Sequence, residues 1–456
     1  MFKKFTNYYR KMTSTEEPGI SEEEDLKDKS LRITVKENAL GSAAGSIGDT
    51  YITPYLIAVK ATLSEIAAFT SITSLVAPLA QLFTSRLIEK FGRKKIVFRL
   101  AILQALIWLP IIASVLLYLN GLKNISFLII VLWTVYALVG NLSAPAGNSW
   151  IGDLVPEIKR GRYFAFLNST GSIISLIGVI ASSFFLDYGK QRNNLFYCFI
   201  ALFGASAIFR FFALYYTKQK YEPKLTLEEG YYFSFWSFIK RMKNNNFGKF
   251  VLHRSIFALA VNIAAPFYGV FVLRELGFSY VQYTIALIIV PTVIQVILFP
   301  FWGKFSDKYG NVETLKASGL LASIYPILWI FSQNFYYILL VPMILNGIAW
   351  AGLNLATANF IFDNVTPKRR SLCFAYFSVL AGFGVFIGAG LGGFLAKMPI
   401  GFMNIFLFIF LISGILRLIS ILIFGRKVNE VRPVKGVKLP YHYLQLLFRP
   451  FFRRGD

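Results

Sequence analysis

One carboxylate lies in a stretch of this sequence where charges are rare. Asp49 falls near the middle of the first apolar run, residues 37–59, which is also rich in glycine and serine. An ionisable group at the centre of a membrane span is costly and needs a partner, a proton or a cationic ligand. Asp49 is therefore a candidate for proton coupling, since a carboxylate held there could load and release a proton. The alternative is a structural carboxylate, hydrogen-bonded to neighbours such as Thr53 or to a facing helix.

A short motif with an acid beside a lysine occurs twice, each time directly after a long apolar run. The first copy contains Ser85, Glu89, Lys90, Gly92 and Arg93, and the second, 218 residues later, contains Gly303, Asp307, Lys308 and Gly310. The small residue lets two helices approach closely, and the acid one turn later lies on the same face. There it can accept hydrogen bonds at a helix N-terminus or pair with a base, and the glycine permits a tight reversal. The simpler alternative is a topology anchor of positive charge.

Two further landmarks repeat in the same order. Asp153 and Arg160 follow the fourth apolar run, whereas Asp363 and Arg370 follow the tenth at an interval of 210 residues. Arg210 and Arg417 repeat at an interval of 207 residues. Each of these two arginines can extend to the membrane interface or pair with an acid of its own half, either Asp153 or Glu157 for Arg210 and Asp363 for Arg417. The order of the landmarks predicts an internal duplication in parallel.

Twelve apolar runs of helical length must carry these residues. Hydrophobic residues make up 56% of the 456 positions and charged residues 15%, against about 25% charged residues in soluble domains. The runs lie near 37–59, 65–88, 95–119, 125–151, 161–187, 193–217, 247–273, 279–305, 313–333, 335–363, 370–396 and 401–425. They predict an all-α integral membrane protein with twelve transmembrane helices in two pseudo-symmetric six-helix bundles.

The polar segments complete this division of the chain. We expect a disordered cytoplasmic tail at 1–34, a bundle at 35–217, a linker with an amphipathic helix at 218–246, a bundle at 247–425 and a basic amphipathic tail at 426–456. The net charge of +24 gathers in alternate short loops. This asymmetry is the positive-inside pattern, so it predicts cytoplasmic termini and argues against a nucleic-acid partner.

Histidine and cysteine are too scarce for several kinds of chemistry. The chain has two of each, which predicts no metal site, no cofactor and no disulfide framework. No nucleophile stands near a base in the sequence, so we expect no enzyme.

The chain resembles the major facilitator superfamily over roughly residues 35–425. The loop from Ser85 to Lys94 looks like the G-x-x-x-D-R/K-x-G-R-R/K motif of that family, with Ser85 in place of its glycine and Glu89 in place of its aspartate. The second copy has Asn311 where the motif has arginine. The resemblance implies that these motifs, with Asp153, Arg160, Asp363 and Arg370, form a latch that stabilises the outward-open state.

The resemblance also implies that helices 1, 4, 7 and 10 line a central cavity. Neutral polar side chains and one indole follow single faces of those helices, and they suit a hydrogen-bonding solute. They are Asn141, Asn148, Asn262, Asn346, Trp350, Asn354 and Thr357. The alternative is hydrogen bonding between helices. Glycines of helix 11, from Gly384 to Gly393, resemble a drug-antiporter motif of helix 5 but favour close helix packing, since Ala389 replaces its proline.

The sequence thus predicts a monomeric secondary transporter of the plasma membrane, which moves a small polar solute by alternating access with proton coupling. It predicts that Asp49→Asn abolishes uphill transport without harming folding. The two rivals are a non-transporting receptor or assembly protein and a lipid scramblase. The amides of helices 4 and 10 weigh against the first, because a silent cavity needs no hydrogen-bonding groups.

Overall fold

The computed structural model describes residues 22–156, 160–223, 234–366, 369–424 and 427–434, and in these ranges the regular elements are all helical. The elements of the N-terminal half are α2 (Glu22–Ile47), η1 (Asp49–Tyr51), α3 (Ile52–Ala58), α4 (Leu63–Ala80), η2 (Gln81–Phe83), α5 (Thr84–Phe91), α6 (Arg93–Leu119), α7 (Ser126–Leu154), α8 (Arg160–Gln191) and α9 (Leu195–Gln219).

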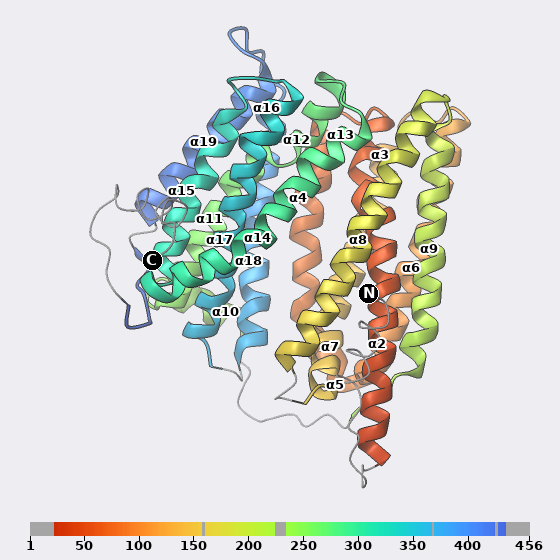
Figure 1. The fold of residues 1–456 in the computed structure, drawn as a ribbon, viewed down its shortest axis with the longest axis vertical. Coiled ribbons are helices and arrows are strands. Elements are labelled where there is room, and N and C mark those ends of the chain that lie inside the picture. The colour runs from red at the N-terminus through yellow and green to blue at the C-terminus, as the bar shows by residue number, and fades with distance from the viewer. Residues whose placement is uncertain (1–21, 157–159, 224–233, 367–368, 425–426, 435–456) are drawn as a thin grey trace, which may run out of the picture. The chain divides into compact units, whose positions relative to one another are not determined.

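The C-terminal half repeats this succession after a short helix (Figure 1). Its elements are α10 (Phe235–Arg241), α11 (Asn246–Ala264), α12 (Phe267–Val270), η4 (Phe271–Glu275), α13 (Tyr280–Thr284), η5 (Ile285–Ile289), α14 (Val290–Tyr309), α15 (Asn311–Leu328), α16 (Phe335–Leu340), α17 (Pro342–Asn364), α18 (Arg370–Leu395) and α19 (Ile405–Phe424). The elements η4 and η5 are single π-helical turns.

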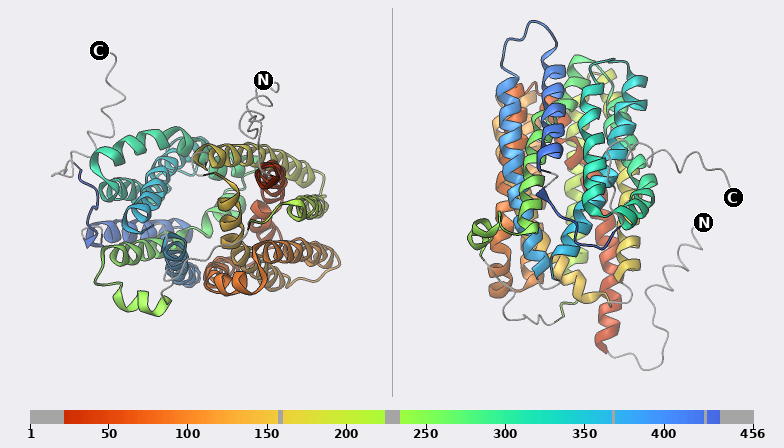
Figure 2. Two further views of the ribbon diagram at one scale, coloured as in Figure 1. Left: turned by 90° about the horizontal axis from the view of Figure 1, so that it is seen from below. Right: turned by 90° about the vertical axis from the view of Figure 1, so that its left-hand side faces the viewer.

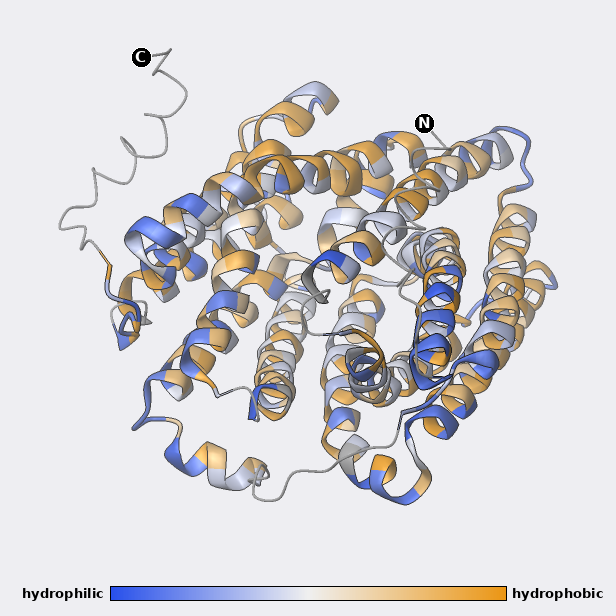
Figure 3. Ribbon diagram, turned by 60° about the horizontal axis from the view of Figure 1, so that its bottom comes forward, coloured by the Kyte–Doolittle hydropathy of each residue, from blue (hydrophilic) through white to orange (hydrophobic). Residues whose placement is uncertain are grey.

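Ten helices of the described residues are long and apolar enough to cross a membrane. Two further segments complete the twelve predicted spans: α2 with η1 and α3, and α15. The first of these is the least apolar of the predicted spans, since it contains Asp49 and several small polar residues. Apolar residues predominate along the helices, whereas polar residues gather near helix ends and in the connections (Figure 3).

The chain forms two compact units, and each is built in the same way. The first unit comprises Met1–Glu228 with Val272–Thr284, and the second comprises Glu229–Phe271 with Ile285–Asp456. In the first unit α2 packs on α8 and α9, α6 packs on α7 and α9, and α4 packs on α7. In the second unit α11 packs on α18 and α19, α15 packs on α17 and α19, and α14 packs on α17. Each of these helix pairs of the first unit thus has its counterpart in the second, and Figure 2 shows helices of both units end-on.

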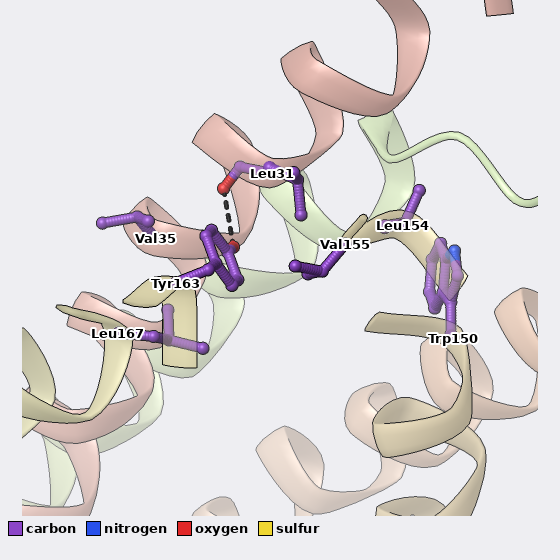
Figure 4. Close-up of a cluster of buried hydrophobic side chains, with 7 residues drawn as sticks. All are labelled: Leu31, Val35, Trp150, Leu154, Val155, Tyr163 and Leu167. Atoms are coloured by element: carbon purple, nitrogen blue, oxygen red, sulfur yellow. Dashed lines mark hydrogen bonds between the residues drawn. The ribbon is translucent and has the colours of Figure 1, made fainter. Parts of the chain in front are cut away.

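The first helix begins earlier than the sequence predicts. Residues 22–34 were expected to be a disordered tail because of their mixed charges, but α2 starts at Glu22. Apolar side chains among these charges explain the difference, because Leu31 and Val35 are buried against the end of α7 and the start of α8 (Figure 4). The hydroxyl of Tyr163 on α8 donates a hydrogen bond of 3.0 Å to the carbonyl oxygen of Leu31. The remaining part of the predicted tail lies outside the described residues.

The predicted amphipathic linker helix corresponds in part to α10. Phe238 is buried, and its ring lies 5.6 Å from that of Tyr376 and 5.8 Å from that of Phe247. Trp236 and the basic residues at the end of the helix face outward. The C-terminal stretch with a similar pattern, from residue 435 onward, lies outside the described residues.

Glycines on α18 allow its close packing against α11. A Cβ atom built at Gly384, Gly388 or Gly392 would collide with the carbonyl oxygen of Ser255, Leu259 or Ile263, respectively. On α8, Gly171 and Gly178 similarly face serines of α2. The glycines of α18, the eleventh predicted span, therefore serve helix packing.

Gly388→Val is expected to destabilise the second unit by about 3 kcal/mol, because the added methyl groups force two packed backbones apart. Gly204→Ala is the matched control, since this helical glycine of α9 has open space around its Cβ position. Thermal unfolding in detergent measures both variants. Equal melting temperatures for Gly388→Val and the wild type would contradict close packing as the role of this glycine.

Candidate functional site

Asp49 forms an ion pair with the arginine of the sixth span. The Nη2 atom of Arg210 lies 2.9 Å and 2.8 Å from the two carboxylate oxygens of Asp49. The hydroxyl of Tyr136 on α7 donates to the same oxygens at 3.0 Å and 2.9 Å, and the guanidinium of Arg210 lies 5.0 Å from the Tyr136 ring. Three helices of the first unit thus join at one carboxylate.

A break in the first span places Asp49 at this junction. The α-helix α2 ends at Ile47, and Asp49 opens the 3-10 turn η1 before helical geometry resumes in α3. At the break, Gly48 approaches the side chains of Ser206 and Trp108 so closely that any Cβ atom would collide with them. Trp108 packs edge-on against Tyr136 and Trp133. Trp133 also stacks on Tyr136 at 4.7 Å, so ring packing restrains the phenol whose hydroxyl contacts Asp49.

The pair is only partly covered. The side chain of Asp49 is 32% exposed and that of Arg210 is 17% exposed. A partly exposed ion pair in the middle of a membrane span is stable where it faces water or a polar ligand rather than lipid. The arrangement carries no net charge while both groups are ionised. A proton or a cationic group that reaches Asp49 competes directly with Arg210 for the same oxygens.

The partners of the two repeated arginines differ from the predicted ones. Arg210 was expected to pair with Asp153 or Glu157, or to extend to the interface, but it reaches Asp49 instead. Arg417 was expected to extend to the membrane interface or to pair with Asp363, but it is fully buried and donates to the carbonyl oxygens of Ala322 and Val261 and to the hydroxyl of Ser413. In both cases the side chain points into its own unit, where the nearest acceptors lie.

A polar junction closes the first unit at the end that carries the repeated motif. Arg93, at the start of α6, is fully buried and forms an ion pair with Asp153 at the end of α7. Its Nη2 atom donates to the carbonyl oxygen of Pro223 at 3.0 Å. Glu222 accepts hydrogen bonds from the backbone N–H groups of Arg93 and Lys94 at 2.8 Å and 3.1 Å. A carboxylate thus caps the N-terminus of α6, where the helix dipole favours negative charge.

The second unit forms the same junction with different residues. Asn311 stands where the first copy has Arg93, and its Nδ2 atom donates to Asp363 at 2.6 Å. The missing guanidinium comes from Arg432, whose Nε atom lies 2.8 Å from the carboxylate of Asp363. The hydrogen bond to Asp363 raises the pKa of Arg432, so the guanidinium stays protonated throughout the physiological pH range. Glu430 caps α15 by accepting from the backbone N–H of Val312 at 2.8 Å.

The lysines and the two motif acids lie at the rim of these junctions. Glu89 is exposed and has no hydrogen-bond partner among the described residues. Asp307 is 78% exposed and lies 3.5 Å from Arg432. Lys90 and Lys308 each lie over the ring of the next residue, at 5.3 Å and 5.0 Å. Glu89 is thus open to a partner, whereas Asp307 already lies against Arg432. The predicted role of both acids in a latch stays a prediction.

The remaining latch residues are placed only in part. Arg370 does not reach Asp363; its Nε and Nη2 atoms donate to the carbonyl oxygens of Val365 and Phe362, at the end of α17. The side chains of Ser85 and Arg160 lie outside the described residues.

The motif glycines adopt backbone angles that other residues avoid. Gly92 has φ 78° and ψ 156°, and Gly310 has φ 92° and ψ 165°. Both values lie in a region that is used almost only by glycine and costs other residues of order 1–3 kcal/mol. The helix on each side can therefore end and restart without a loop.

Gly310→Ala is expected to lower the stability of the second unit by about 1–3 kcal/mol, since the strain is added and the new methyl group displaces the carboxylate of Glu430. Gly303→Ala, in the same motif, has open space around the Cβ position and a helical backbone, so it should be neutral. Thermal unfolding of both variants tests this, and a loss of equal size in Gly303→Ala would contradict it.

The amides predicted to line a cavity in the first unit have different surroundings. Asn141 accepts a hydrogen bond of 2.8 Å from Gln81 and donates to the carbonyl oxygen of Ala137. Asn148, two turns later on α7, is exposed. The first therefore joins two helices, whereas the second remains open to a ligand.

In the second unit the predicted residues follow one helix face of α17, with Asn262 on α11. Asn262 and Thr357 donate to carbonyl oxygens one turn earlier. Asn354 is exposed and donates to Gln295 at 3.3 Å. The Oδ1 atom of Asn346 is buried without a partner among the described residues. Trp350 is half-buried on the same helix.

Sequence reasoning missed the acids that cap the two junctions. Glu222 and Glu430 each follow the last helix of their half, at an interval of 208 residues. That repeat was a usable signal, but Glu222 fell in a segment read as linker and Glu430 in one read as tail. Asp187 was also missed, although it stands near the end of a long apolar run.

Asp187 fastens a segment from later in the chain to the first unit. Its two carboxylate oxygens accept hydrogen bonds from the backbone N–H groups of Tyr280 and Val281 at 2.7 Å and 2.9 Å. In the same segment Arg274 donates to the carbonyl oxygen of Ile57 at 3.0 Å. The hydroxyl groups of Tyr51 and Thr284 lie 3.3 Å apart.

Comparison with known proteins identifies the family. The model of the Major Facilitator Superfamily matches residues 39–252 and 250–455. The chain is 22% identical over 303 residues to an uncharacterized MFS-type transporter of Methanocaldococcus jannaschii, covering 65% of this chain and 75% of that one. It is 26% identical over 152 residues to the quinolone resistance protein NorA of Staphylococcus aureus, covering 33% of this chain and 38% of NorA.

A crystal structure of the nucleoside transporter NupG has the same fold. Its TM-score is 0.62 at 15% identity, and the match covers 88% of this chain and 98% of that one. The sequence resemblance, the paired helix packing and the family match across both halves agree. The chain belongs to the Major Facilitator Superfamily, and it is a multi-pass membrane transporter.

Proposed function

We propose that this protein is a secondary active transporter that moves a small polar solute by alternating access, with Asp49 as the proton-coupling group. The observation that carries the proposal is the partly exposed Asp49–Arg210 pair in the middle of a membrane span. A pair with no transport role gains nothing from exposure, since burial or replacement by apolar residues would serve the fold as well.

The proposed coupling uses exchange of partners at one carboxylate. When a proton binds an oxygen of Asp49, the carboxylate loses its charge and its ion pair with Arg210 weakens. Arg210 then carries an unbalanced charge, which a solute or the opposite conformation must compensate. When Asp49 releases the proton to the other side, the pair forms again. Tyr136 donates to the carboxylate in the ionised state and keeps its oxygens oriented.

In this proposal the polar side chains of α7, α11 and α17 supply hydrogen bonds to the solute. Asn148 and Asn354 are exposed, and the Oδ1 atom of Asn346 has an unfilled acceptor position among the described residues. The basic residues of each junction support a cytoplasmic position for that end of its own unit. We propose that the membrane is the plasma membrane.

We further propose that Asp187 holds a gate in the conformation observed. Asp187→Asn removes the charge that faces the two backbone N–H groups, so the fastened segment should open about tenfold more often, a change of roughly 1.4 kcal/mol. Opening is reported by a cysteine at position 284, because Thr284 is fully buried. The reporter variant carries Thr284→Cys and has Cys198 and Cys373 replaced by serine. Its rate of thiol modification should rise about tenfold. Glu275→Gln is the control, and equal rates in both backgrounds would contradict a gate.

The test of the function is flux in proteoliposomes. The reconstituted protein is given labelled sugars, amino acids, organic acids and nucleosides, with and without a pH gradient. Uptake that exceeds equilibrium only with a gradient supports the proposal. Flux of labelled lipid without solute flux would replace it with a scramblase, and binding without any flux would replace it with a receptor.

A further inference from the structure

A further buried arginine, on α11, has no counter-ion among the described residues. Arg254 is 9% exposed and lies inside the span from Asn246 to Glu275. Its Nε and Nη1 atoms are buried without any hydrogen-bond partner in the described part of the chain. In the described residues its guanidinium makes one cation–π contact, with the ring of Phe257 at 5.3 Å. Next to it, His253 is 3% exposed, and its Nε2 atom is likewise without a described partner.

The acids in the described part of the second unit are all engaged elsewhere. Asp363 and Asp307 pair with Arg432, Glu430 caps α15, and Glu313 pairs with Lys316 at 2.7 Å. Arg254 therefore has no carboxylate among the described residues of its own unit. Guanidinium groups do not deprotonate in proteins, so the residue cannot lose its charge to relieve this.

Arg417 shows how the same unit satisfies a buried arginine when the role is structural. Arg417 is fully buried, and its three guanidinium nitrogens donate to Ser413, Ala322 and Val261. An unpaired buried charge is strongly destabilising, and a membrane interior makes relief by water difficult. The open donors of Arg254 thus need a partner that the described part of its unit does not supply.

Contacts at the start of α11 show which part of α17 lies at the level of Arg254. Asn246 donates to Asn364 at 3.1 Å, and the ring of Phe250 stacks on that of Phe360 at 4.3 Å. The two helices are antiparallel, because α11 advances from 246 to 250 while α17 recedes from 364 to 360. One further turn along α11 brings Arg254 to the level of Ala356, next to Thr357 on the proposed cavity face of α17.

We propose that Arg254 is a binding site for a small anion with a carboxylate or phosphoryl group, and that the transported solute is such an anion. The planar guanidinium can donate two parallel hydrogen bonds to either group, through Nη2 together with Nε or Nη1. This inference rests on the proposed function and gives it a substrate class. The first unit presents a balanced ion pair to its ligand, whereas the second presents an unbalanced positive charge.

The proposal is tested by thermal unfolding of the purified full chain in lipid-free detergent. The probes are inorganic phosphate, succinate and glycerol 3-phosphate, with succinamide and glycerol as neutral counterparts. At least one anion should raise the melting temperature of the wild type by several degrees, while its neutral counterpart does not. Arg254→Gln should lose this shift, and Lys249→Gln, which removes a charge from the same helix, should keep it.

Two further readouts keep the test decisive. Without any anion, Arg254→Gln should melt at or above the wild-type temperature, because an unpaired charge has been removed. Should that variant not fold, Arg254→Lys keeps the charge without the planar fork and should bind the anion at least tenfold more weakly. A shift that persists in Arg254→Gln, or no shift with any anion, overturns the proposal.

Lipid and flux measurements separate this inference from the proposed function. Stabilisation by phosphatidylglycerol alone, with no response to soluble anions, would assign the site to a lipid headgroup and overturn the substrate class. Flux of a neutral solute at equal rates in the wild type and Arg254→Gln would overturn the proposal that the solute is an anion, whereas the proposal of a transporter would stand. Anion binding that depends on Arg254, without any flux, would support the anion site and overturn the transporter.

Discussion

Asp49→Asn is expected to abolish gradient-driven accumulation of solute while downhill exchange continues. The asparagine cannot ionise, so no proton can be loaded and released at this position. The variant should also be less stable, since Arg210 loses its counter-ion. Removing one partner of a buried pair costs about 3–5 kcal/mol, and the 32% exposure of Asp49 reduces this to about 1–3 kcal/mol. The sequence-based expectation of unharmed folding is therefore revised.

The double variant Asp49→Asn, Arg210→Gln separates the two effects. It removes both charges, so the melting temperature should return toward that of the wild type, whereas accumulation should remain absent. Glu65→Gln serves as the control, because it removes an acid that only caps α4. Uphill transport in the double variant, measured in proteoliposomes with an imposed pH gradient, would show that coupling lies elsewhere.

Arg93→Gln is expected to cost about 3–5 kcal/mol, as removal of one member of a buried ion pair does. Arg93 is fully buried, and its loss leaves both Asp153 and Glu222 without their base. The corresponding change in the second unit, Arg432→Gln, should cost about 1 kcal/mol or less, because the Arg432 side chain is 35% exposed. The two junctions therefore offer one experiment with an internal comparison.

Thermal unfolding of the two variants measures this difference directly. Arg93→Lys should be intermediate, since it retains the charge but cannot donate to Asp153 and Pro223 at once. Losses of equal size in Arg93→Gln and Arg432→Gln would mean that burial does not determine the energy of these junctions.

The architecture was predictable from the sequence because each span leaves a long apolar run, and because the duplication repeats its landmarks. Asp49 was predictable for the same reason, since a charge is conspicuous among apolar residues. Its partners were harder to predict. Tyr136 looks like any aromatic residue of an apolar run. Asp153 is nearer to Arg210 in sequence than Asp49 is, but in the fold it pairs with Arg93.

The junctions show a different limit. Asn311 breaks the family motif, and the sequence alone offers no reason for it. The structure supplies one: Arg432, beyond the last helix, contributes the guanidinium that Asn311 lacks. The early start of α2 was hidden in the same way, because its charged residues surround the few apolar ones that are buried.

The segment 272–284 has a consequence for how the duplicated halves depend on each other. It is encoded in the second half of the chain, yet it is part of the first compact unit. A polypeptide that stops at residue 223 would lack the groups that Asp187 binds. Separate expression of the two halves should therefore yield fragments that recover activity only when they are produced together. The boundary between the two compact units therefore does not coincide with the boundary between the two sequence halves.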